Sequence, residues 1–216
     1  MVKYRIILLA LLTYAIGHSQ DSSRFKDEVE AITKKYDSLW DPSKPTVVFT
    51  GSSSIRIWKD LEQRFPQHQI INSGFGGSQA SDLLIHVDEL VLKYNPSKVF
   101  IYEGDNDISA HKRPNAIIDT SKEIIDKIKK KDSTTQIVLI SAKPSIARWN
   151  LKRKYKRLNR KFNRLSKKDD HLEFADVWTP MLNGRKVKTD IFIKDGLHMN
   201  AQGYELWHNV IKAYMD

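Results

Sequence analysis

Val47-Val48-Phe49-Thr50-Gly51-Ser52-Ser53-Ser54-Ile55 is a short β-branched and aromatic run that ends abruptly in glycine and three serines. The segment after it has the apolar spacing of a helix. Gly51 allows a sharp turn, and serine hydroxyls can cap a helix or face solvent. Open α/β proteins hold their chemistry at such a place, outside the carboxyl end of a strand. Taken alone, the stretch fits equally well a serine-rich turn in which Ser54 is a helix N-cap.

Outward from this turn, strand-like and helix-like segments alternate along the chain. Continuous apolar runs, typical of strands buried on both faces, predict strands at residues 46–50, 69–72, 98–103, 136–141 and 172–175. Amphipathic spacing predicts a short helix after Ile55 and longer helices at residues 22–39, 78–94, 116–131, 150–168 and 201–214. A long loop is expected at residues 176–196. The alternation predicts one α/β domain with a central, mainly parallel five-stranded sheet covered on both faces.

The first residues differ in composition from the rest. Lys3 and Arg5 precede an apolar run at residues 6–16, and small residues follow at plausible cleavage positions. The run is shorter than the roughly 20 residues that span a bilayer. We therefore expect a cleaved signal peptide at residues 1–19, a secreted or periplasmic protein and no stable membrane span, with a buried or anchoring N-terminal helix as the alternative. Residues 20–45 would then form an N-terminal helix and lead-in, and residues 46–216 the main domain.

The composition limits the possible chemistry. The chain of 216 residues has no cysteine, which excludes thiol nucleophiles, disulfides and zinc–thiolate sites. Its formal net charge of +10 suggests anionic neighbours such as acidic glycans, lipid headgroups or nucleic acid.

The densest basic segment is residues 148–168, which contain no acid. An apolar stripe along this segment predicts that one face of a helix packs on the sheet, through Leu151, Tyr155, Leu158, Phe162 and Leu165. The outward charges are either an ordinary solvated face or an electrostatic guide for an anionic substrate.

Polar residues follow the first three predicted strands where each one ends. Besides the serine turn, these residues include Gly77 after the second strand and Asn106 after the third. Because the carboxyl ends of parallel strands lie at one edge of a sheet, we expect these residues to lie close together. Asp195 and His198 can share one turn, with the acid accepting from one ring nitrogen and leaving the other free. Such a histidine can deprotonate a serine, while a Gly77 N–H and the Asn106 amide can face a developing oxyanion. Each residue also has a structural explanation, as a turn, an Asx-turn, a loop carboxylate or a helix cap.

Four stretches carry a resemblance to the SGNH, or GDSL-type, serine hydrolases, and within them to platelet-activating-factor-acetylhydrolase-like esterases. They are VVFTGSSSIRIW, INSGFGGSQASDLL, VFIYEGDNDIS and DGLHMNAQGYELW, and they span residues 47–207 in the family's order. The resemblance implies a flavodoxin-like three-layer α/β/α sandwich and a Ser–His–Asp site that needs no metal or cofactor. By position, it matches Ser53 to the nucleophile, Gly77 and Asn106 to the oxyanion-hole donors, Asp195 to the orienting acid and His198 to the base.

One departure from the family's pattern concerns the nucleophile. The family usually has an acid before it, and here that position is Ser52. Ser52, Ser53 and Ser54 therefore remain alternatives, although the spacing from Gly51 favours Ser53.

A second departure is Asp105, which stands where the family commonly has a small neutral residue. An acid there can place negative charge near the site, and the sequence does not show in which direction its carboxylate points. Lys143 and Arg148 come just after the fourth strand, near the expected active edge. Both could touch substrate, but we do not include them among the candidate site residues.

Together these patterns predict a serine hydrolase. We expect carboxylic esters with small acyl groups as substrates, with acetyl groups on a glycan favoured because the chain has no long apolar lid segment. The alternatives are a lipase or lysophospholipase that cleaves lipid esters, and a non-catalytic surface- or glycan-binding module that retains the fold. The basic charge favours an anionic small-molecule, glycan or lipid ester. A nucleic-acid partner is not expected, since the chain has no recognisable motif and its export signal argues against one.

Overall fold

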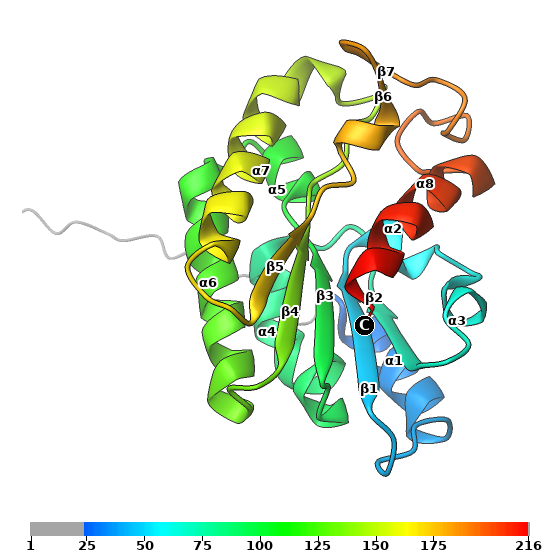
Figure 1. The fold of residues 1–216 in the computed structure, drawn as a ribbon, viewed down its shortest axis with the longest axis vertical. Helices are drawn as coiled ribbons and strands as arrows, with labels where there is room; N and C mark the ends of the chain where they lie inside the picture. Colours follow the sequence, from blue (N-terminus) through cyan, green and yellow to red (C-terminus); the bar gives the residue numbers. More distant parts are fainter. Residues whose placement is uncertain (1–23, 216) are drawn as a thin grey trace, which may run out of the picture.

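The computed structural model describes residues 24–215, and the predicted signal peptide lies outside them. The described chain is a three-layer α/β/α sandwich around a five-stranded parallel sheet (Figure 1), which confirms the predicted fold class. The strand order β2-β1-β3-β4-β5 is that of flavodoxin-like sheets. The strands are β1 (Thr46–Gly51), β2 (Gln69–Gly74), β3 (Lys98–Tyr102), β4 (Gln136–Ile140) and β5 (Leu172–Ala175).

Helices cover both faces of the sheet. The first face packs against α1 (Lys26–Asp37), α4 (Ala80–Leu90), α6 (Pro114–Lys131) and α7 (Lys152–Ser166). The opposite face packs against α2 (Ser53–Arg56), α3 (Leu61–Arg64) and α8 (Ala201–Ile211). Short 3₁₀ turns extend or connect these elements, at η1 (Leu92–Tyr94), η2 (Trp149–Leu151) and η4 (Lys212–Tyr214).

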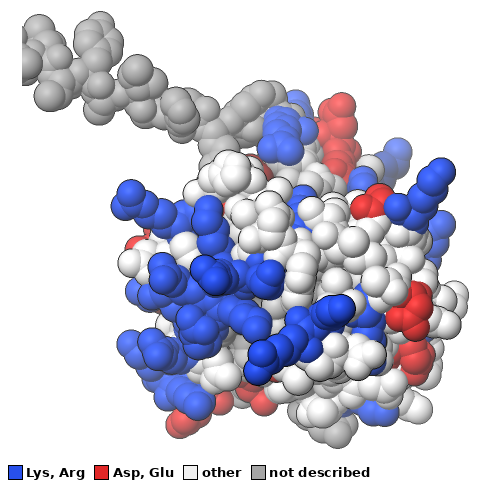
Figure 2. Space-filling model, turned by 90° about the horizontal axis from the view of Figure 1, so that it is seen from above, with Lys and Arg blue, Asp and Glu red and all other residues white. Residues whose placement is uncertain are grey.

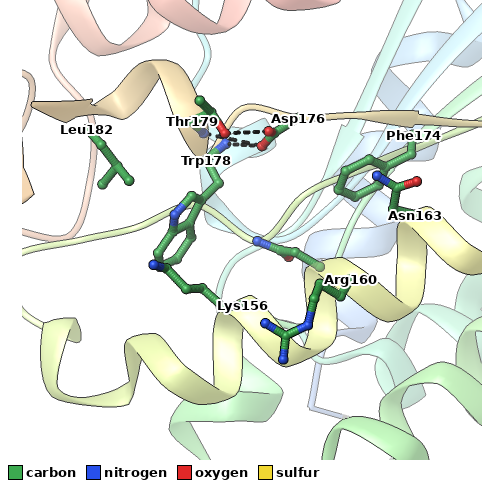
Figure 3. A pocket seen from close by; sticks show the side chains of 9 residues that line it. Lys156, Arg160, Asn163, Phe174, Asp176, Trp178, Thr179 and Leu182 are labelled. Carbon is green, nitrogen blue, oxygen red and sulfur yellow. Dashed lines mark hydrogen bonds between the residues drawn. The ribbon is translucent and has the colours of Figure 1, made fainter. Parts of the chain in front are cut away.

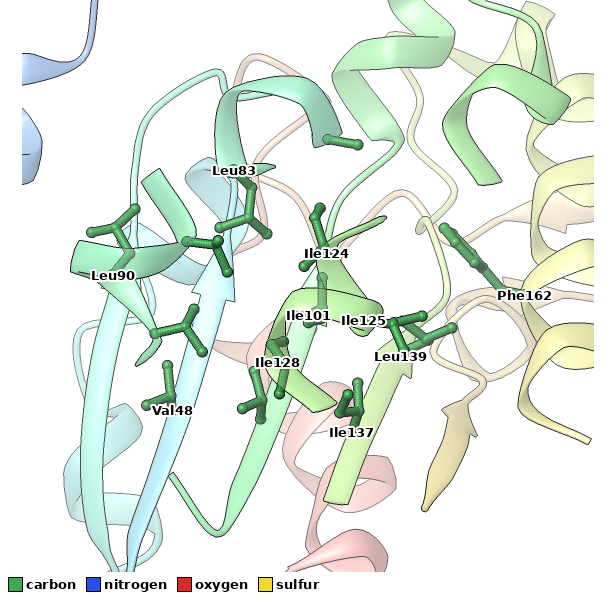
Figure 4. Packing of buried hydrophobic residues seen from close by; sticks show 14 of the residues in the cluster. Val48, Leu83, Leu90, Ile101, Ile124, Ile125, Ile128, Ile137, Leu139 and Phe162 are labelled. Atoms are coloured by element: carbon green, nitrogen blue, oxygen red, sulfur yellow. The ribbon is translucent and has the colours of Figure 1, made fainter. Parts of the chain in front are cut away.

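Each strand contributes to two apolar cores, because successive side chains of a strand point to opposite faces. Val99 and Ile101 of β3 lie in the core under α4, α6 and α7, where Figure 4 shows Ile101. Phe100 and Tyr102 lie in the core under α2 and α8. All four of these side chains are buried. The strand is therefore buried on both faces, as its continuous apolar sequence predicts.

Three segments differ from the sequence-based expectation. A short helix, α5 (Asp105–Ser109), follows β3, where the sequence pattern predicts only the end of the strand and no helix. The single helix expected after Ile55 is divided into α2 and α3. The expected loop at residues 176–196 contains a 3₁₀ turn, η3 (Thr179–Met181). It also contains a hairpin of two antiparallel two-residue strands, β6 (Leu182–Asn183) and β7 (Lys186–Val187).

Gly51 determines how the chain leaves the sheet. Its φ is 120°, and a Cβ at this position would lie 2.0 Å from the Tyr102 carbonyl oxygen, so only glycine fits. The next N–H, that of Ser52, donates to the same carbonyl at 3.1 Å. The chain therefore turns directly at the carboxyl edge of the sheet and begins α2 at Ser53. Among the described residues, no helix is long and apolar enough to cross a membrane.

Candidate active site

Ser53, His198 and Asp195 form a hydrogen-bonded chain at this edge. Ser53 Oγ lies 3.0 Å from His198 Nε2, and His198 Nδ1 lies 2.6 Å from Asp195 Oδ2. A carboxylate can only accept, so Nδ1 carries the proton and the lone pair of Nε2 faces the serine hydroxyl. The arrangement can therefore remove a proton from Ser53.

Burial distinguishes Ser53 from the two serines beside it. Ser52 and Ser54 are only 2% and 3% exposed, whereas Ser53 is partly exposed. The N-cap position of α2 is Ser52, so the prediction of Ser54 as a helix cap is wrong. The reason is that β1 ends at Gly51, which brings the chain into helical geometry two residues earlier than expected. Ser53 is therefore the serine whose hydroxyl is both accessible and close to a base.

The turn from Asp195 to His198 is organised by the Asp195 carboxylate. Its Oδ1 accepts from the backbone N–H groups of Leu197 at 2.8 Å and His198 at 2.9 Å. Gly196 has a φ of 63°, and an added Cβ would lie 3.1 Å from Ile146 Cβ. Burial opposes the charged form of Asp195, but the hydrogen bonds from the His198 ring and the two N–H groups outweigh it and lower its pKa to about 2. The carboxylate is therefore charged at neutral pH and can stabilise an imidazolium.

Asn106 lies in the first turn of α5, beside the serine turn. Its Nδ2 donates to Ser52 Oγ at 3.1 Å and to the Ser78 carbonyl at 2.9 Å. Its Oδ1 accepts from Arg148 Nη2 at 3.0 Å. Because a guanidinium only donates, the amide oxygen must face Arg148 and the NH₂ group must face the serine turn.

Gly77 lies in the turn between β2 and α4, one residue before the carbonyl that Asn106 contacts. In the part of the chain that the structure describes, neither its backbone N–H nor that of Ser53 meets an acceptor. Free N–H groups near a nucleophile are what an oxyanion site requires. The structure thus brings all five predicted site residues to one edge of the sheet.

Asp105 lies behind Asn106 and is buried. Its Oδ1 accepts from Arg148 Nη1 and from the Tyr155 hydroxyl, each at 2.6 Å, and its Oδ2 lies 3.3 Å from Lys143 Nζ. Burial would raise the pKa of Asp105, but the charges of Lys143 and Arg148, with the Tyr155 hydrogen bond, hold it well below its ordinary value. The negative charge is therefore compensated within this cluster.

Arg148 and Lys143 are the residues that the sequence-based site leaves out and the structure brings to it. Arg148 bridges Asp105 and Asn106, and Lys143 Nζ donates to the Leu197 carbonyl at 2.8 Å, within the turn that carries His198. Their position just after the fourth strand was the available signal. The sequence gives no sign that their partner is an acid about forty residues earlier. No group of three or more His, Asp or Glu side chains that could hold a metal occurs among residues 24–215.

The sequence profile of the GDSL-like Lipase/Acylhydrolase family matches residues 37–206. A solved structure from Streptococcus pneumonia, provisionally assigned as a platelet activating factor, is similar with a TM-score of 0.77 at 24% identity, over 89% of this chain and 94% of that one. A GDSL-like lipase from Bacteroides thetaiotaomicron has a TM-score of 0.71 at 21% identity, over 90% and 96%. A carbohydrate esterase family 3 structure from Talaromyces cellulolyticus has a TM-score of 0.66 at 15% identity, over 79% and 96%. These likenesses show the fold, and no curated protein matches the chain in sequence.

Proposed function

The chain belongs to the GDSL-like lipase/acylhydrolase family and is an ester-bond hydrolase, and from this premise we propose that it cleaves carboxylic esters by a Ser–His–Asp mechanism. The observation that carries the proposal is the continuous hydrogen-bonded chain from Ser53 through His198 to Asp195. The free N–H groups of Ser53 and Gly77 and the oriented amide of Asn106 support it.

In this mechanism Ser53 Oγ attacks the ester carbonyl while His198 Nε2 accepts its proton. The N–H groups of Ser53 and Gly77 and the Asn106 amide stabilise the tetrahedral oxyanion. His198 then protonates the leaving alcohol, and water activated by the same nitrogen releases the acid and restores Ser53. Asp195 holds the ring and stabilises the imidazolium. Since the Asn106 amide already donates to Ser52 Oγ, the oxyanion competes with that hydroxyl for the same N–H.

The proposed substrate is an ester with a small acyl group, such as acetyl on a glycan. The absence of a long apolar lid segment in the sequence supports this, as does the fold shared with a carbohydrate esterase. A lipid ester is the second candidate, because two exposed isoleucines border the site. Ile193 is 49% exposed and pairs through its backbone with His198, and Ile146 is 42% exposed beside Gly196.

Single-serine variants test the mechanism with p-nitrophenyl acetate as substrate. Ser53→Ala should retain only the residual rate that binding and the oxyanion donors provide. Ser52→Ala and Ser54→Ala are matched controls from the same turn and should remain active. Full activity in Ser53→Ala would contradict the assignment of Ser53 as the nucleophile. A p-nitrophenyl ester series from acetyl to dodecanoyl then separates the two candidates, since kcat/KM falls with chain length for an acetylesterase and rises for a lipase.

We also propose that the chain is exported and that residues 1–19 are removed. Lys3 and Arg5, followed by a short apolar run and small residues, support this. Expression of residues 1–216 in a host with a secretory pathway should yield an exported protein whose N-terminal sequence begins at Gln20. An exported protein that still begins with Met1 would contradict the proposal.

A further inference from the structure

A pocket separate from the candidate active site lies between α7 and the chain that follows β5. Its cavity of about 340 Å³ is within the size range of small-ligand sites. Figure 3 shows the side chains of α7 on one side of the pocket and those of β5 and the next segment on the other. We call it the α7 pocket, and it is lined by Lys156, Asn159, Arg160, Asn163, Phe174, Asp176, Trp178, Thr179 and Leu182.

The charge of the α7 pocket is positive. Lys156 and Arg160 lie one turn apart on α7, and neither takes part in an ion pair found within residues 24–215. The lining contains one carboxylate, Asp176, which is engaged in its own turn. Its oxygens accept from the N–H groups of Trp178 and Thr179 and from the Thr179 hydroxyl. Lys156 and Arg160 are therefore available to an incoming anion.

The rest of the lining suits a ligand with a ring. The partly exposed Phe174 supplies aromatic surface, and Asn163 supplies an exposed amide, while Trp178 is buried behind them. The Trp178 ring also stacks on Trp149, with centroids 6.0 Å apart and planes 17° from parallel. Trp149 directly follows Arg148, so the pocket wall is continuous with the segment that holds Asn106.

The surroundings extend this positive charge. Seen from above in Figure 2, basic side chains gather on the side of the molecule where Figure 1 places α6 and α7. Residues 152–168 contain ten lysines and arginines and no acid. A polymer with repeated anionic groups would therefore be attracted along α7 as well as into the pocket.

We propose that the α7 pocket binds a sugar residue that carries a carboxylate or a sulfate, within an anionic glycan. The inference rests on the proposed function in one respect, namely that the same glycan presents its ester to Ser53. Binding itself needs only the pocket. Paired cations match the anionic group, and the Phe174 ring with the Asn163 amide matches a sugar ring and its hydroxyls.

Two other polyanions fit the surface less well. A nucleic acid would use several exposed aromatic rings on which successive bases stack, but the α7 pocket offers only the partly exposed Phe174, because Trp178 is 6% exposed. A membrane would use exposed apolar residues, but the large hydrophobic side chains exposed on the described surface lie elsewhere than on α7, at Leu39, Ile85, Ile146 and Ile193.

Equilibrium binding tests the proposal without any turnover. Calorimetric titrations would use the full chain with three ester-free probes, which are polygalacturonate oligomers, dextran sulfate oligomers and neutral dextran. At least one anionic sugar should bind, and comparison of the two identifies carboxylate or sulfate. Lys156→Glu/Arg160→Glu should weaken binding about tenfold or more, because it replaces two cations that can donate charge-assisted hydrogen bonds by two anions that repel the ligand.

A matched control uses the same helix and its C-cap residue. Arg153→Glu/Lys167→Glu changes one arginine and one lysine at exposed positions that do not line the α7 pocket, and it should weaken binding less than about threefold. Three results would each overturn the inference. The two variants could lose equal affinity, or neutral dextran could bind as tightly as the anionic sugars. Single-stranded DNA or anionic phosphatidylglycerol vesicles could also bind more tightly than the sugars in a way that depends on the pocket. An active Ser53→Ala variant overturns only the proposed mechanism, because the binding result does not depend on it.

Discussion

Asn106 is the residue on which much of the candidate oxyanion site depends, and its orientation is set by groups that do not face the substrate. Arg148 donates to the amide oxygen at 3.0 Å and is itself held by Asp105 at 2.6 Å. A flipped amide would place two donors against a guanidinium, which has no acceptor. Asp105, the acid that departs from the family pattern, therefore holds Arg148 in the position that orients the Asn106 amide.

Replacement of Arg148 tests this positioning role. Arg148→Met should lower kcat by about tenfold with little change in KM, because one charge-assisted hydrogen bond is lost while the ester contacts remain. Asn106→Ala should lose more, about 10²–10³ in kcat. Both are measured with p-nitrophenyl acetate. Arg148→Lys keeps a charge beside Asp105 and should recover part of the rate, and an unchanged kcat in Arg148→Met would show that the contact does not position the amide.

The sequence predicts the candidate site to the extent that its residues follow local patterns. Ser53, Gly77 and Asn106 each come just after an apolar run, so strand ends alone place them at one edge. Asp195 and His198 are close in sequence, so one turn brings them together. The contact of Asp105 with Arg148 depends on side-chain directions across 43 residues of separation, and no local pattern encodes it.

At the scale of elements, α7 follows its sequence closely, whereas the segment just after β3 does not. The apolar stripe of α7 packs on the sheet as predicted, with Tyr155, Leu158 and Phe162 buried. The helix α5 was not predicted because Gly104 and its polar neighbours have turn composition, and helix formation there depends on burial of Ile108 in the core. Tertiary packing has overridden local propensity.

The carboxyl end of β3 also carries a buried acid. Glu103 is 2% exposed and accepts from the Ser78 hydroxyl at 2.6 Å, while its second oxygen has no partner among the described residues. Burial, reinforced by the nearby charge of Asp107, raises the pKa of Glu103 well above its ordinary value, although the Ser78 hydrogen bond opposes the shift.

This shift makes the free energy of unfolding depend on pH. A folded-state pKa above the unfolded value of 4.5 means that the folded chain binds the proton more tightly, so the contribution is complete below pH 4.5 and is lost as the pH rises through the folded pKa. Glu103→Gln should therefore show a shallower loss of stability than the wild type in urea unfolding between about pH 5 and 9. Glu123→Gln, at an exposed position of α6, serves as the control. An equally steep decline in Glu103→Gln would exclude Glu103 as the titrating group.

At the scale of the whole molecule, the fold was predicted more completely than its surface. Apolar runs and their alternation with amphipathic segments are enough to specify a parallel sheet covered on both faces, and the strand order completes it. The α7 pocket was not predicted, because it forms between residues 156–163 and 174–182, and a cavity depends on the packing of both segments. The sequence showed only that the basic face exists.

The charge of the molecule is unevenly distributed, and we expect this distribution to affect the rate at which it meets a charged substrate. The lysines and arginines of α7, which has no acid, should raise the local concentration of anionic esters near the carboxyl edge. Salt screens such fields, with a Debye length of about 10 Å at 0.1 M and about 3 Å at 1 M. KM for mono(4-nitrophenyl) succinate should therefore rise by about threefold or more between about 0.02 M and 0.5 M sodium chloride, while KM for neutral p-nitrophenyl acetate stays constant. Arg153→Glu/Lys167→Glu should reduce this salt dependence, because it removes positive charge from α7 and its C-cap without changing the candidate site. If both esters respond to salt alike, the field of α7 does not guide the substrate.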